Sequence, residues 1–287
     1  MKKVTLIIIL SILTSPVIFS QISTVEKNAL VDLYNSTNGE NWNTTWDLNE
    51  APTTWHGVTV ENNSVTEINL SMNNLNGTIP SSIGNLKSVK HLNLGFNKIQ
   101  GMIPNEITSI ENLEVLELFM NQLEGTIPNS IGNLKNLKQL VLFNNLITGY
   151  LPESIYSLKN LEVLHISSNK LTGLISSNVK NLTNLETLSL FDNAMFGNIP
   201  PEIGNLTNLH ELTLANNLFE GEVPNELSKL KNLEILLLNN NRFIGSISPT
   251  IENMPQLLNF EYTNNSLEVG AIDDISIPTT YKTILPQ

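Results

Sequence analysis

Residues 113–134 read LEVLELFMNQLEGTIPNSIGNL, and this stretch decides the fold. The same pattern of leucine, asparagine, glycine and proline recurs every 24 residues in strict register. Position one of the repeat falls at Val65, Val89, Leu113, Leu137, Leu161, Leu185, Leu209, Leu233 and Leu257. A period of this length indicates a solenoid, in which each coil buries its apolar face against the neighbouring coils.

Each repeat contains one short segment in which apolar and variable residues alternate. Leu116, Glu117 and Leu118 show this alternation, which suits a strand with one buried face. Strands of successive coils would stack about 4.8 Å apart, so nine coils predict a parallel sheet on the order of 40 Å long. The fold class that follows is an α/β repeat solenoid.

Position nine is an asparagine in every coil, at the point where the chain turns out of the strand. A buried amide in a turn can bond backbone groups that would otherwise lack partners, which predicts a structural ladder and no binding role. The ladder consists of Asn73, Asn97, Asn121, Asn145, Asn169, Asn193, Asn217, Asn241 and Asn265. Proline at position sixteen fixes the outer bend, and Ser176 and Ser248 replace it in two coils. We expect a looser convex side at those two serines.

The full unit, L-x-x-L-x-L-x-x-N-x-L-x-G-x-I-P, resembles the plant-type leucine-rich repeat over some three quarters of the chain. This resemblance implies a right-handed superhelix with a parallel concave sheet and an irregular or 3-10 convex side. Plant-type repeats serve as receptor ectodomains and as inhibitors of secreted cell-wall hydrolases. The resemblance therefore implies partner binding, whereas the residues alone do not name the partner.

Residues 1–20 carry the features of a secretory signal peptide. Lys2 and Lys3 precede an apolar run from Val4 to Leu13, which is too short to span a bilayer, and the small residue Ser20 follows. We expect a secreted or cell-surface protein without membrane insertion after signal cleavage. The many Asn and Ile residues and the single arginine, Arg242, favour an AT-rich, bacterial genome.

Two caps are predicted around eight full repeats, which cover residues 65–256. Residues 21–64 hold a helix opened by the capping box Ser23-x-x-Glu26, and they include all three tryptophans. The tryptophans could form a ligand platform, but an exposed solenoid end favours a hydrophobic lid. This segment resembles the amino-terminal cap of plant-type repeat proteins without the usual cysteine pair. Residues 257–287 form a partial ninth repeat and a carboxy-terminal cap, which includes Asp273 and Asp274.

Composition limits the chemistry of the chain. It contains no cysteine, which excludes disulfides and thiolate metal sites, and we expect no metal and no cofactor. The net charge is -12 at pH 7, which argues against nucleic acid as a partner. Oligomeric state is left open by the sequence.

Ligand contacts are expected at positions three, five, seven and eight, which point off the strands onto the concave face. The candidate partner-binding residues are Met72, Phe96, Val115, Phe119, Met120, Val141 and Phe143 on neighbouring coils, with Phe191 two coils further on. Clustered methionine and aromatic side chains are typical of protein and peptide interfaces. The alternative is that the phenylalanines fold down beside the asparagine ladder and pad the strand edge.

A second group of concave residues carries charge: Glu67, His91, Glu117, His165, Asp192 and Glu211, with Glu261 in the last coil. A histidine beside a glutamate can do acid–base work if both are buried and close. On an open, hydrated sheet we expect ordinary pKa values and a role as rim charges that select partners.

The sequence thus predicts a non-enzymatic recognition module for a protein, peptide or glycan on the concave face, with a possible role in signalling or adhesion. Alternatives are an inhibitor of a secreted hydrolase, a structural surface spacer and, least favoured, an enzyme. No nucleophile elbow or phosphate-binding glycine loop is present in the sequence.

Overall fold

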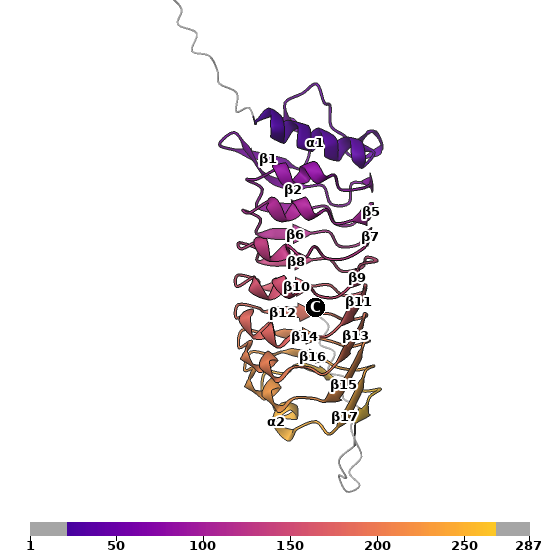
Figure 1. The fold of residues 1–287 in the computed structure, drawn as a ribbon, viewed down its shortest axis with the longest axis vertical. Helices are drawn as coiled ribbons and strands as arrows, with labels where there is room; N and C mark the ends of the chain where they lie inside the picture. The colour runs from indigo at the N-terminus through magenta and orange to yellow at the C-terminus, as the bar shows by residue number, and fades with distance from the viewer. Residues whose placement is uncertain (1–21, 268–287) are drawn as a thin grey trace, which may run out of the picture.

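One strand from each coil joins a ten-stranded sheet in the computed structural model, which describes residues 22–267 (Figure 1). Its parallel strands are β2 (Ser64–Asn69), β4 (His91–Asn93), β6 (Val115–Glu117), β8 (Gln139–Val141), β10 (Val163–His165), β12 (Thr187–Ser189), β14 (Glu211–Thr213), β16 (Ile235–Leu237) and β18 (Asn259–Glu261). Strand β1 (Val58–Glu61) pairs antiparallel with β2 and closes the amino-terminal edge. The predicted signal peptide and the Asp273–Asp274 pair lie outside the described residues.

A second set of strands runs down one flank of the stack (Figure 1). Three of these strands are β3 (Asn76–Gly77), β5 (Lys98–Met102) and β7 (Gln122–Glu124). Six more are β9 (Thr148–Gly149), β11 (Lys170–Gly173), β13 (Ala194–Gly197), β15 (Leu218–Glu222), β17 (Arg242–Gly245) and β19 (Ser266–Leu267). Their side chains alternate between the core and the solvent, so each flank strand presents one outward row.

Short helical turns occupy the side opposite the flank strands in Figure 1. The 3-10 turns are η1 (Gly39–Asn41), η2 (Pro52–Thr54), η3 (Ser81–Asn85), η4 (Asn105–Ser109), η5 (Ile131–Asn133), η6 (Glu153–Ser157), η7 (Ser177–Asn181), η8 (Pro201–Asn205) and η9 (Asn225–Lys229). The α-helices are α1 (Thr24–Ser36) and α2 (Pro249–Glu252). The fold is an α/β leucine-rich-repeat solenoid.

The repeat asparagines lie where each concave strand turns towards the flank, and Asn145 shows their bonding. Its side-chain amide donates to the carbonyl oxygens of Leu118 and Leu142, both at 3.0 Å. Its side-chain oxygen accepts the backbone N–H of Leu123 at 3.0 Å. Asn145 is 6% exposed, so these bonds join adjacent coils in an environment with little water.

Residues 22–57 cover the first coil with a packed aromatic cluster. Trp42, Trp46 and Trp55 are buried, and the rings of Trp46 and Trp55 stack with centroids 4.7 Å apart. The capping-box residue Glu26 also reaches the repeats, because its Oε1 accepts the backbone N–H of Val65 at 3.1 Å. The buried tryptophans fill the solenoid end and leave little ring surface for a ligand.

The expectation of a looser convex side at Ser176 and Ser248 is wrong. Ser176 keeps a proline-like backbone, with φ -67° and ψ 148°, and its hydroxyl accepts the N–H of Asn178. Ser248 caps α2 in the same way through the N–H of Thr250. Each serine restores by side-chain bonding the bend that proline fixes in the other coils.

Candidate functional site

The concave face of the first three coils holds an acid–histidine triad, which consists of Glu67, His91 and Glu117. The strand register sets Glu67 on β2 opposite His91 on β4, and Glu117 lies on β6 two residues beyond Val115, the residue opposite His91. His91 Nδ1 lies 3.3 Å from Glu67 Oε1, and His91 Nε2 lies 2.9 Å from Glu117 Oε2. Both ring nitrogens therefore face carboxylates, which favours the doubly protonated imidazolium.

The triad corrects the expectation of ordinary pKa values on this face. The hydrogen bond to Glu117, together with the charges of both carboxylates, raises the pKa of His91. Because both ring nitrogens are engaged, His91 cannot act as a general base without breaking a contact with a carboxylate. With His91 protonated, the triad carries one net negative charge and offers carboxylate oxygens at the surface. It is suited to attract a cationic group.

An aromatic stack continues the site into coils three to five. The rings of Phe119 and Phe143 are stacked at 4.9 Å, and Phe143 stacks on the imidazole of His165 at 4.6 Å. The other face of Phe119 lies against Gly95, where an added Cβ would sit 2.5 Å from the ring. Stacking covers the faces of both phenylalanine rings, so a ligand would contact the ring edges. Burial lowers the pKa of His165, so this residue is no rim charge.

Position eight of every coil has a left-handed backbone. In the first three coils it is occupied by Met72, Phe96 and Met120, with φ of 56°, 55° and 51°. We call these three residues the apolar edge. Coils four to nine use the polar residues Asn144, Ser168, Asp192, Asn216, Asn240 and Asn264 at this position.

Asparagine and aspartate tolerate the left-handed region better than most residues, whereas bulky side chains there cost on the order of 1 kcal/mol each. Met72 and Phe96 are nevertheless 66% and 48% exposed, so burial returns little of that cost. At the apolar edge, the side chains present are therefore not those that would make the left-handed backbone most stable.

The remaining predicted residues divide into accessible and inaccessible ones. Val141 is only 9% exposed, so its place in the binding patch is wrong. Val115, Phe119, Met120, Phe143 and Phe191 are half-buried, which leaves room for both padding and contact. Asp192 is exposed and lies far from the triad in the sequence. Glu211 is half-buried, and this burial raises the pKa of its carboxyl group.

A hydroxyl row that sequence reasoning missed follows the aromatic stack. Ser167 Oγ lies 2.7 Å from Ser189 Oγ, which lies 2.6 Å from Thr213 Oγ1. All three residues are buried and bonded to one another, so they offer few groups to a ligand. Small residues at positions five and seven of neighbouring coils were the available signal. The accessible candidate site therefore lies in coils one to five.

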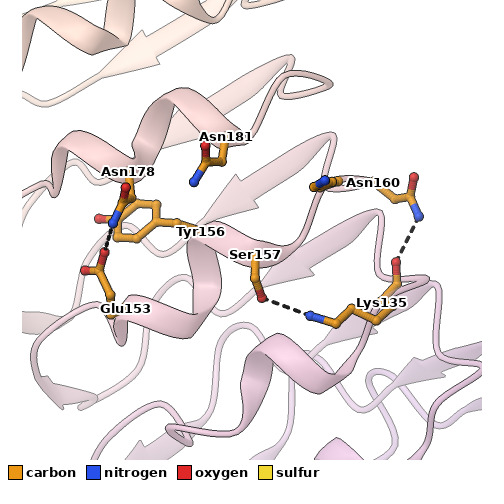
Figure 2. Close-up of a pocket in the computed structure, with 8 residues that line it drawn as sticks. Lys135, Glu153, Tyr156, Ser157, Asn160, Asn178 and Asn181 are labelled. Atoms are coloured by element: carbon orange, nitrogen blue, oxygen red, sulfur yellow. Dashed lines mark hydrogen bonds between the residues drawn. The ribbon is translucent and has the colours of Figure 1, made fainter.

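A hollow on the convex side is lined by Lys135, Glu153, Tyr156, Ser157, Asn160 and Asn178, among others (Figure 2). Burial raises the pKa of Tyr156 to about 12, and its Oη accepts the backbone N–H of Ser176 at 3.2 Å. Glu153 accepts from Asn178, and Lys135 Nζ donates to Ser157 Oγ at 3.1 Å. These groups bond to one another across neighbouring coils, which indicates a structural role.

Two features are absent from residues 22–267. No helix there has the length and apolar character needed to cross a membrane. Within the same range, no cluster of three or more histidine and acidic side chains has a geometry suited to a metal ion.

Family models match most of the repeat region. A leucine-rich repeat region model matches residues 119–222, and two further leucine-rich repeat models match residues 63–123 and 232–254. The chain carries a leucine-rich-repeat domain. Among curated proteins the comparison finds no significant match.

Solved structures similar to this leucine-rich-repeat domain include plant receptor ectodomains. The ectodomain of the Arabidopsis thaliana membrane receptor kinase GASSHO1/SCHENGEN3, bound to CASPARIAN STRIP INTEGRITY FACTOR 2, is 35% identical with a TM-score of 0.81. PEPR1–AtPEP1 is 31% identical with a TM-score of 0.77. The Arabidopsis receptor kinase HAESA, with the peptide hormone IDA and the co-receptor SERK1, is 29% identical with a TM-score of 0.70.

Each of these alignments covers 85% of this chain. The chain spans only 30%, 35% and 46% of the respective receptor chains. The likeness supports a ligand-binding repeat domain, whereas activities of the whole receptors are not carried over by it.

Proposed function

We propose that this chain is an extracellular, non-enzymatic recognition module that binds a peptide segment on the concave face of coils one to five. The similar ectodomains of GASSHO1/SCHENGEN3 and HAESA are bound to a named factor and a peptide hormone, respectively, which supports a peptide as the ligand class. The predicted signal peptide supports the extracellular location.

The apolar edge is the observation that carries this proposal. Polar residues fill position eight in coils four to nine, and five of the six are asparagine or aspartate, which tolerate the left-handed region, so the fold itself does not require Met72, Phe96 or Met120 there. Retaining exposed apolar side chains at a backbone cost is explained by contact with a partner. The acid–histidine triad lies on strands of the same three coils, so an apolar and an acidic surface adjoin.

Ring orientation favours a peptide over a glycan. Sugars bind aromatic residues by covering ring faces, but Phe119 and Phe143 cover each other, with Gly95 and His165 at the two ends. The exposed ring edges carry partial positive charge and suit carbonyl oxygens and aliphatic groups. The ligand we propose therefore combines an apolar side chain, for the apolar edge, with a lysine or arginine for the triad.

A selection from a displayed library of random twelve-residue peptides tests this assignment. We expect enriched sequences to combine basic and apolar residues and to bind the wild-type chain. In the double variant Phe96→Asn/Met120→Asn their affinity should fall at least tenfold, while the free energy of unfolding should rise by roughly 0.5–2 kcal/mol as the left-handed cost is relieved. Isothermal titration and urea unfolding measure the two quantities.

Asp192→Asn is the matched control, because it changes position eight in a coil outside the site and should leave peptide binding unaltered. A failure to enrich any peptide, or binding that survives in the double variant, would refute the concave assignment. Equal loss in the Asp192→Asn control would indicate an unspecific effect of charge, which also contradicts it.

A further inference from the structure

The flank sheet exposes a second apolar surface, separate from the concave site. Its members, which we call the flank patch, are Tyr150, Leu174, Phe196, Leu218 and Ile244, with exposed fractions of 67%, 57%, 45%, 37% and 50%. They come from five consecutive coils, four to eight. Exposed apolar residues that gather on one side of a molecule mark interaction surfaces in soluble proteins.

The strand register draws the centre of the patch into one row. Phe196 on β13 is directly opposite Leu218 on β15, and Gly173 on β11 is opposite Met195 on β13. Leu174 follows Gly173 and Phe196 follows Met195, so these two residues continue the same register. Leu174, Phe196 and Leu218 therefore lie side by side on adjacent strands, about 4.8 Å apart.

The patch is flat, because its side chains lie over glycines of the next coil. The ring of Tyr150 covers Gly173, and Leu174 covers Gly197, so neither glycine has room for a side chain. Equivalent positions in other coils carry polar residues, such as Thr126 in place of Tyr150 and Leu174. Folding does not require apolar residues at these outward positions.

Charge around the patch is balanced, although the chain as a whole carries -12. The outward charged residues of β11, β15 and β17 are Lys170, Glu220, Glu222 and Arg242, which sum to zero. Two copies of an acidic chain repel each other in general, but not where they meet through this surface. The base Lys170 and the acids of β15 lie on opposite sides of Phe196.

We propose that the flank patch is the interface of a twofold homodimer of this chain. A twofold axis that lies in the plane of the contact near Phe196 brings Lys170 of each copy opposite Glu222 of the other. Five large, half-exposed side chains supply several hundred Å² of apolar area per copy, a large part of the roughly 800 Å² that each partner buries in a standard interface. The concave site stays open in such a dimer, because it lies on the other sheet.

Sedimentation velocity on the full chain, over a concentration series, tests the dimer. We expect a monomer–dimer equilibrium whose dissociation constant rises at least tenfold in Leu174→Ser/Phe196→Ser. Met102→Ser is the matched control, because Met102 is 68% exposed on the same flank but outside the patch, and it should leave the equilibrium unchanged. Circular dichroism verifies that the variants are folded.

A charge exchange tests the twofold geometry itself. Lys170→Glu should weaken the dimer by bringing acids together, and Lys170→Glu/Glu222→Lys should restore it. A wild-type chain that stays monomeric at about 100 µM overturns the proposal. A dimer that persists in Leu174→Ser/Phe196→Ser also overturns the proposal. If residues 268–287 of the same chain cover the patch, the full chain is monomeric, which also overturns it.

Discussion

Single residues on the concave face are the most informative about function, because some of them are not the residues that would best stabilise the local backbone. At position eight the backbone is left-handed in every coil, and six coils carry a polar residue there, of which five are asparagine or aspartate. Met72 and Phe96 accept a conformational cost that burial does not repay, and Met120 is half-buried at the same position of the third coil. In the binding mode that we propose, stability and recognition therefore oppose each other at position eight of the first three coils.

His91 and His165 provide a test of the concave electrostatics at the same scale. The raised pKa of His91 means that its contribution to stability is fully present below the unfolded pKa, about 6.5, and is lost as pH rises through the folded pKa. The stability difference between wild type and His91→Gln should therefore be larger near pH 6 than near pH 8.5. We expect about 0.5–1 kcal/mol at most, because the ring is one-third exposed.

His165→Gln serves as the opposite-sign control for this experiment. Burial lowers the pKa of His165, so the wild-type chain loses stability as pH falls through about 6.5, and the variant removes that loss. Urea unfolding across this pH range measures both differences. Changes of the same sign in the two variants would contradict the arrangement of the triad and the stack.

The sequence identified which residues share the concave face, but not how their side chains are used there. Period and alternation suffice to put Glu67, His91 and Glu117 on neighbouring strands. Whether a phenylalanine stacks along the solenoid axis or points to solvent depends on its neighbours, such as Gly95. The run of asparagine at position eight carried the signal for a left-handed backbone, and the apolar exceptions could have been identified from it.

At the scale of elements, the junction between α1 and the first repeat depends on one carboxylate. Glu26 accepts the backbone N–H of Ser23 at 3.2 Å and that of Val65 at 3.1 Å, and it is only 7% exposed. Glu26→Ala removes the capping box and leaves the buried Val65 N–H without its partner. We expect a loss of roughly 2–4 kcal/mol in unfolding free energy, detected by tryptophan fluorescence.

Glu26→Gln should recover only part of that stability, because the two N–H groups bond to different carboxylate oxygens and the single amide oxygen can replace only one of them. Glu40→Ala changes an exposed acid in η1 and should have an effect below about 0.5 kcal/mol. A Glu26→Ala variant as stable as wild type would mean that the cap is held by its tryptophans alone.

Element boundaries show where sequence reasoning reached its limit. The capping box at Ser23 predicted the start of α1, since capping chemistry is local. The flank strands were not predicted, because their short segments are defined by pairing with adjacent coils. The flank patch could not be predicted from the sequence, because only the pairing of the flank strands puts Leu174, Phe196 and Leu218 in one row.

At the scale of the whole molecule, cooperativity depends on bonds between neighbouring coils, since no coil contacts a distant one extensively. Asn145 belongs to the fourth of nine coils, and its side chain joins three backbone groups across the stack. Asn145→Ala leaves those groups without partners, which costs roughly 2–4 kcal/mol at a single interface. The remaining interfaces keep their energies, so the expected result is a division of the solenoid into two unfolding units.

Tryptophan position makes this division measurable. All three tryptophans lie in residues 42–55, so their fluorescence reports the amino-terminal unit, whereas far-UV circular dichroism reports every coil. In wild type we expect the two urea transitions to coincide. In Asn145→Ala the circular dichroism should change first, because the apolar residues Leu257 and Phe260 of the last coil are only half-buried among residues 22–267, while an aromatic lid covers the first coil. Asn265→Ala, in the last coil, is the control and should lower stability without separating the two transitions. Coincident transitions in Asn145→Ala would show that the asparagine ladder does not provide the coupling between coils.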